Sequence, residues 1–113
     1  MMSAQELDAL RHPRIVAFHK FFSEYHMFFE TGPDRFRVSI RVYETDDGRY
    51  FFEQSHYIRT PVQEQSQVLT AEKHPVPAAA LKRAVESITT YYEDAVGRGH
   101  QPSTDWFVRN DVY

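Results

Sequence analysis

The chain has 113 residues, of which 42% are hydrophobic and 15% aromatic, enough for one core and a single domain, 1–113. It has no cysteine, which excludes a disulfide scaffold, thiolate zinc sites and thiol nucleophiles. The formal net charge of -3 gives no reason for strong nucleic-acid binding by the chain as a whole. No apolar run approaches the ~20 residues of a membrane span, and no signal-peptide pattern opens the chain. We expect a cytoplasmic domain that makes no membrane contact.

The first thirty residues favour two helices. Ser3 and Glu6 have the spacing of a capping box, which predicts a short helix ending near Arg11. Pro13 suits the first turn of a second helix. Five apolar residues then recur with helical spacing: Ile15, Phe18, Phe22, Tyr25 and Phe29. We predict a helix over this stretch, although residues 25–29 also suit a short strand.

The strongest pattern is a β-hairpin. Apolar and polar residues alternate over 35–43, and a second strand over 49–59 follows the turn at 46–48. A three-residue loop gives the register that keeps the apolar faces together, with Gly48 in a left-handed conformation. This register pairs Val42 with Phe52, Arg41 with Glu53, Phe36 with Ile58, and Arg37 with Tyr57.

The second half of the chain predicts one long helix. Residues 62–72 are polar and weakly patterned, and a third strand around 65–70 is plausible. A wide apolar stripe then predicts a helix over 77–96 that ends at Gly97 or Gly99. The tail contains Trp106, Phe107 and Val108, so we expect it to dock as an edge strand or against the sheet.

Together these elements predict an α+β fold. We expect an antiparallel sheet of three or four strands, with the long C-terminal helix and an N-terminal helix packed on one face. The expected core joins the inward residues of the hairpin to one stripe of the long helix. Its members are Phe36, Val38, Ile40, Val42, Phe52, Ile58, Leu81, Val85, Ile88 and Tyr92.

Arginine and aromatic residues are interleaved on the outward face of the hairpin. The candidate interface residues on this face are Arg37, Arg41, Tyr43, Phe51, Tyr57 and Arg59. Such a face suits contact with a protein, because Arg and Tyr are common in interface hot spots. It equally suits base stacking and phosphate contact in RNA. A third interpretation is that the arginines only cover aromatic neighbours with their aliphatic stems.

Histidine and glutamine also fall on the inward face. The predicted register turns Gln54 and His56 toward the apolar side, as a hydrogen-bonded core pair or as part of a polar pocket. Ser55 and His56 would then point to opposite faces, which excludes a nucleophile–base pair. Three histidines are spaced by seven residues, about 10.5 Å apart on a helix, too far to share one metal. We expect no metal, no cofactor and no catalytic residue.

The predicted element order resembles two known families. A helix, three strands and a last helix resemble double-stranded-RNA-binding domains, and Gly32-Pro33 falls where that family often has a Gly-Pro turn. The family's lysine cluster at the start of the last helix is missing from residues 76–80, and so are the phosphate contacts it would make. Residues 35–96 are similar in layout to HicB-like antitoxin domains, with Asp47-Gly48-Arg49-Tyr50 at the hairpin. Both resemblances imply the α+β fold rather than a function.

From the sequence, the leading functional hypothesis is a small non-enzymatic interaction module. We expect a homodimer, or a complex with another protein, formed through the Arg/aromatic face of the hairpin. The first alternative is RNA binding through the same face. The second is a small-molecule or enzymatic pocket around His56 and Gln54.

Overall fold

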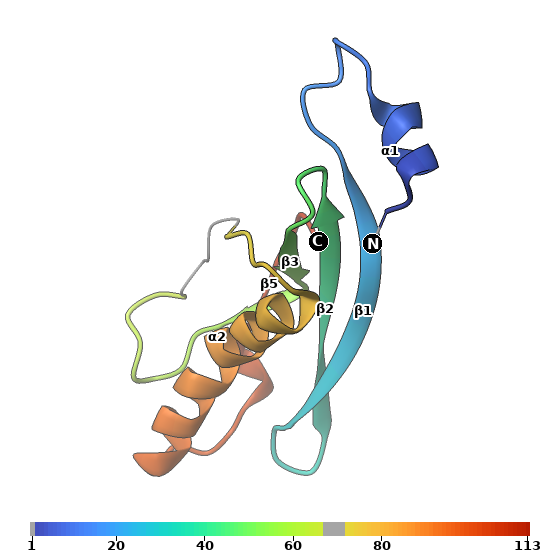
Figure 1. Ribbon diagram of the computed structural model, residues 1–113. Helices are drawn as coiled ribbons and strands as arrows, with labels where there is room; N and C mark the ends of the chain where they lie inside the picture. The colour runs from blue at the N-terminus through green and yellow to red at the C-terminus, as the bar shows by residue number, and fades with distance from the viewer. Residues whose placement is uncertain (1, 67–71) are drawn as a thin grey trace.

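The computed structural model describes residues 2–66 and 72–113, and its fold is α+β. A three-stranded antiparallel sheet, a second two-stranded sheet and a long C-terminal helix form the body of the molecule (Figure 1). This architecture confirms the predicted fold class. The elements are α1 (Ala4–Leu10), β1 (His19–Glu30), β2 (Arg35–Thr45), β3 (Tyr50–Gln54), β4 (His56–Ile58), α2 (Pro77–Gly97), the 3₁₀ turn η1 (Thr104–Trp106) and β5 (Phe107–Arg109).

The hairpin of β2 and β3 has the predicted register. Val42 lies opposite Phe52 and Arg41 lies opposite Glu53. Gly48 has a φ of 74°, so the three-residue loop uses the left-handed conformation that glycine permits. The sheet order is β1-β2-β3, all antiparallel.

The second strand of the hairpin leaves the first sheet at Ser55. The predicted pairs of Phe36 with Ile58 and Arg37 with Tyr57 are therefore wrong. Beyond the bend, β4 pairs with β5 and places Tyr57 opposite Val108 in the second sheet. The tail thus docks as a strand, as its apolar residues predict.

The predicted helix from Pro13 to Phe29 is wrong, because this stretch contains β1. β1 pairs with β2 along its whole length, from His19 opposite Thr45 to Glu30 opposite Arg35. Its many aromatic residues favour a strand, and pairing with β2 decides between the two periodicities. A register shift between Phe21 and Ser23 interrupts the alternation that would otherwise indicate a strand. The short strand considered for 25–29 is confirmed.

The capping box predicted at Ser3 is present, and so are the short N-terminal helix and the long C-terminal helix. The Ser3 hydroxyl accepts from the Glu6 amide and completes a capping box at the start of α1. α1 lies beside the start of β1, where the Lys20 ammonium donates to the Glu6 carboxylate at 2.7 Å. α2 begins at Pro77, as predicted, and ends one residue beyond the predicted end, at Gly97. Most of the possible strand at 65–70 lies outside the described residues.

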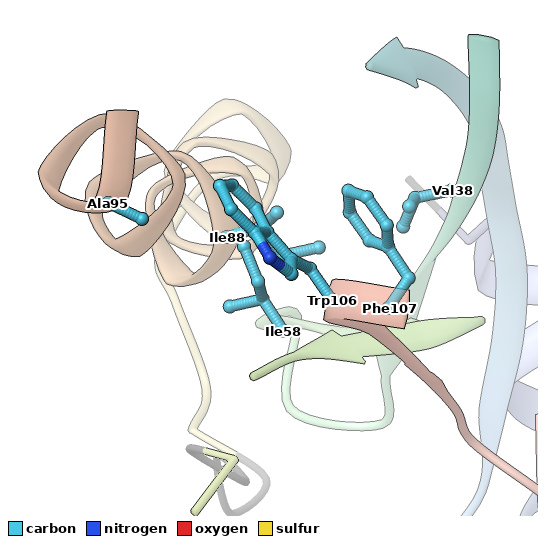
Figure 2. Packing of buried hydrophobic residues seen from close by; sticks show 6 residues of the cluster. All are labelled: Val38, Ile58, Ile88, Ala95, Trp106 and Phe107. Carbon is cyan, nitrogen blue, oxygen red and sulfur yellow. The ribbon is translucent and has the colours of Figure 1, made fainter. Parts of the chain in front are cut away.

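The core lies between α2 and the two sheets. Ile58 of β4 lies beside Ile88 of α2, and Val38 of β2 lies beside Phe107 in the same cluster (Figure 2). Trp106 and Phe107 close the same cluster from the tail. A second cluster continues toward the hairpin turn and consists of Ile40, Val42, Tyr50, Ala80 and Ala84.

α2 contacts β2, β3 and β4, and its Tyr92 hydroxyl donates to the Glu30 carbonyl at the end of β1 at 2.7 Å. The rest of β1 extends beyond the helix (Figure 1). The molecule is accordingly long, with principal extents of 54 × 25 × 23 Å. Over residues 2–66 and 72–113, no helix is both long and apolar enough to cross a membrane.

Truncation of Ile40 to alanine tests the assignment of the core. Ile40 is fully buried, so the change should lower the free energy of unfolding by about 2–5 kcal/mol, through lost transfer energy and a residual cavity. Urea denaturation measures this loss. Val112→Ala is the control, because Val112 is 87% exposed and its truncation should change stability by less than about 0.5 kcal/mol. Equal losses in the two variants would contradict the assigned core.

Candidate functional site

The six candidate residues of the hairpin face do not form one surface. Tyr43 and Phe51 stack at 5.1 Å between ring centroids near the hairpin turn. His19 and Phe21 of β1 join them edge-on, so four rings form an aromatic cluster on the outward face. This cluster extends across all three strands of the first sheet.

Arg41 lies under the C-terminal tail. Its Nε donates to the Glu24 carboxylate at 2.9 Å, and its guanidinium lies 3.9 Å from the centre of the Tyr113 ring. The Tyr113 hydroxyl donates to the same Glu24 oxygen at 2.8 Å. These hydrogen bonds lower the pKa of Glu24 to about 2, and the bond from Tyr113 has the largest effect. Arg41 is therefore held within the molecule rather than free to bind a partner.

The other candidates separate at the bend of the second strand. Arg37 and His56 line a pocket of about 230 Å³ between the two sheets. Gln54 and Tyr57 line a different pocket, of about 240 Å³. Arg59 is exposed next to Tyr57. His56 and Gln54 thus do not share the single pocket considered from the sequence.

Gln54 is a buried, hydrogen-bonded core residue. Its Nε2 donates to the His56 carbonyl at 2.9 Å, and its Oε1 accepts from the Ser87 hydroxyl of α2 at 3.3 Å. The amide therefore ties the bend of the strand to the helix. This agrees with the core interpretation, although its partners are a backbone carbonyl and Ser87 rather than the imidazole of His56.

Ser55 and His56 lie on the same side of the chain, which corrects the prediction of opposite faces. The strand bends at Ser55, and its Oγ comes within 2.8 Å of His56 Nδ1. The same Oγ accepts from the Ser39 amide at 2.8 Å, so it joins the His56 ring to the backbone of β2.

The surroundings of His56 oppose a hydrolytic role. Burial, and then the positive charge of Arg109, lower the pKa of His56 below its ordinary value of 6.5. A general base must accept a proton and needs an acidic partner to stabilise the imidazolium. Arg109 is the residue directly opposite His56 in the β4–β5 pair, and it has the wrong charge. The charge of Arg109 thus disfavours the imidazolium that His56 would form as a general base.

Exposed aromatic residues on β1 are the surface feature that the sequence pattern missed. Phe21, Phe22, Tyr25 and Phe28 are 52%, 42%, 39% and 61% exposed. They lie on both faces of a strand that has β2 as its neighbour on one side and, among the described residues, no strand on the other. The bulge between Phe21 and Ser23 is the reason that simple alternation did not identify this strand.

The described residues contain no group of three or more His, Asp or Glu side chains that could hold a metal ion. No family model matches the chain, and searches of curated proteins and of solved structures find no similar protein. The resemblances in element order therefore add no functional residue, and function must be argued from the geometry.

The lowered pKa of His56 predicts a pH dependence of stability. Below pH 6.5 the unfolded chain binds a proton that the folded protein resists, so stability should fall between pH 7.5 and 5.5. The carboxylates with lowered pKa lose their contribution only below about 4.5, outside this window. Urea midpoints at the two pH values, for wild type and His56→Gln, measure the effect. A pH dependence of equal size in both proteins would contradict the prediction.

Proposed function

We propose that the protein is a homodimeric interaction module in which β1 strands from two copies pair edge to edge. The single observation that supports this proposal is the outer edge of β1, which pairs with no strand of residues 2–66 and 72–113 and has large apolar side chains exposed on both faces. An open strand edge with apolar side chains readily pairs with another strand, and many proteins block such edges. β1 is 12 residues long. A second copy of this strand can cover both the backbone groups and the aromatic rings.

Charge complementarity selects an antiparallel register centred on Tyr25. A twofold axis at Tyr25 places Glu24 of one copy opposite His26 of the other on the outward face. An axis at Glu24 or at His26 would instead oppose identical groups. The carboxylate of Glu24 is ionised above a pH of about 2, because its pKa is held there by Tyr113 and Arg41. Its Oε1 accepts from Arg41 and Tyr113, and its Oε2 lies 3.4 Å from His26 Nε2 of the same chain. In this register the His26 ring of the second copy therefore joins an existing Glu24–His26 pair.

The same register sets two further facing pairs, of which one joins two aromatic rings. Ser23 of one copy lies opposite Met27 of the other on the inward face. Beyond the bulge, Phe21 comes opposite Phe28, so two highly exposed rings cover each other on the outward face. The two three-stranded sheets then form one continuous six-stranded sheet.

The proposed dimer contact lies on β1 rather than on the Arg/aromatic face of the hairpin that we expected from the sequence. Arg41 bonds to Glu24 and Tyr113, and Tyr57 belongs to the second sheet, so these two residues cannot act together on one partner. RNA binding through the hairpin face is less well supported for the same reason. Tyr43 and Phe51 remain part of the outward sheet surface, one and two strands from the proposed contact.

A charge at the proposed axis should separate the dimer. Tyr25→Arg places two positive charges opposite each other at the centre of the interface, so the variant should be a folded monomer. Light scattering at equal protein concentration measures the mass of wild type and variant. Val112→Arg is the matched control, because it adds the same charge to a residue that is 87% exposed on the tail, and it should remain dimeric. A monomeric wild type would overturn the proposal.

A cysteine probe tests the register, since the chain has no cysteine of its own. At the axis, Tyr25→Cys brings two Cα atoms to about 4.5–5.5 Å, within the range that a disulfide bridges. Oxidation should yield a disulfide-linked dimer on a non-reducing gel. Phe28→Cys is the control, because the two copies of residue 28 would be roughly 20 Å apart in this register. Equal crosslinking of both variants, or of neither, would exclude an axis at Tyr25.

A further inference from the structure

The junction between the two sheets encloses a pocket with an unbalanced positive charge. Arg37 enters it from β2 and Arg109 from the end of β5, while His56 lines it from β4. No acidic residue lines the pocket, and neither arginine forms an ion pair within the part of the chain that the structure describes. Among the described residues, four of the ten arginines form an ion pair, and these are Arg11, Arg41, Arg83 and Arg98. Two unpaired guanidinium groups at one pocket call for an anion.

The neutral groups of this pocket are donors as well. The Ser55 hydroxyl bonds Nδ1 of His56, and Nε2 of His56 bonds none of the described residues, so it can donate to a ligand in the tautomer that carries its proton there. Ser39 also lines the pocket, and its hydroxyl bonds to none of the described residues. Two cations and two neutral hydrogen-bonding groups therefore line one pocket. No carboxylate of the lining competes with an anion for them.

The His56 ring and Asn110 are held in place by contacts within the fold, whereas Arg37 and Arg109 are exposed. The His56 ring contacts Phe36 edge-on at 4.9 Å, and Phe36 in turn stacks on Phe107 at 4.6 Å. Asn110 closes one side, and its amide Nδ2 donates to the Gln54 carbonyl at 2.9 Å while its backbone amide donates to the Ser55 carbonyl at 2.8 Å. The part of the wall formed by His56 and Asn110 is thus set by the fold before any ligand binds, which lowers the entropic cost of binding.

We propose that this pocket binds a small oxyanion of the phosphate class, with Arg37 and Arg109 as the charged ligands and His56 and Ser39 as neutral donors. A phosphate dianion balances two guanidinium charges, and its tetrahedral oxygens accept bidentate bonds from arginine. The volume of about 230 Å³ is below that of typical small-molecule sites, about 300–1,000 Å³. The pocket thus suits inorganic phosphate or a phosphomonoester with a short substituent. This proposal does not depend on the dimer, because none of these residues belongs to β1.

Titration of the full chain with inorganic phosphate tests the site. Calorimetry in phosphate-free buffer at constant ionic strength should give saturable binding by the wild type. Arg37→Gln and Arg109→Gln should each weaken binding about tenfold or more, because each removes a charge-assisted hydrogen-bonding group. Arg49→Gln is the matched control: it removes the same charge from an exposed arginine at the hairpin turn and should bind phosphate like the wild type.

Three results would overturn the proposal. The first is no saturable binding of phosphate by the folded wild type. The second is equal weakening in all three variants, which would indicate general charge screening rather than a site. The third is binding of a short single-stranded RNA that depends on Arg37 and Arg109 while inorganic phosphate does not bind, which would indicate a nucleic-acid groove. Far-ultraviolet circular dichroism and thermal melts confirm that each variant is folded.

Discussion

The bend at Ser55 is the constraint on which the rest of the structure depends. Up to Gln54 the strand pairs with β2, and at Ser55 the amide still donates to the Ser39 carbonyl at 2.8 Å. The return bond, however, runs from the Ser39 amide to the Ser55 hydroxyl rather than to a backbone carbonyl. A serine side chain thus replaces one ladder acceptor and frees the main chain to turn away without leaving a buried amide unsatisfied.

The consequences of this bend reach the tail and the core. The Ser55 carbonyl, which no longer bonds β2, accepts from the Asn110 amide of the tail, and the Gln54 carbonyl, on the free edge of β3, accepts from the Asn110 side chain. β5 can therefore pair with β4, and Trp106 and Phe107 enter the cluster around Ile88. The pocket between the sheets is the space that opens on the outward side of the same bend. One local bond thus positions the second sheet, half of the core and the proposed anion site.

The two proposed sites differ in physical character. The β1 edge is apolar, long and exposed, and a self-complementary arrangement about Tyr25 covers it with a second copy of the same strand. The pocket at the sheet junction is small and cationic, and it suits a compact anion. A module that both dimerises and binds a small anion would present two such pockets, one on each copy, because each is formed within a single chain. The two sites lie on different strands, so either can be removed by mutation without disturbing the other.

Elements with strong local signals could be predicted from the amino-acid sequence alone. The capping box at Ser3, the apolar stripe of α2 and the β2–β3 register all depend on neighbouring residues, and all three are confirmed. The strand at residues 19–30, in contrast, depends on tertiary pairing with β2. The bulge at Phe22 shifts the alternation of its side chains, so that the apolar residues recur with a spacing like that of a helix. The meeting of Ser55 with His56, and of Arg37 with Arg109, was likewise not predictable. Both depend on a bend whose stabilising bonds come from Ser39 and Asn110, residues far away in the chain.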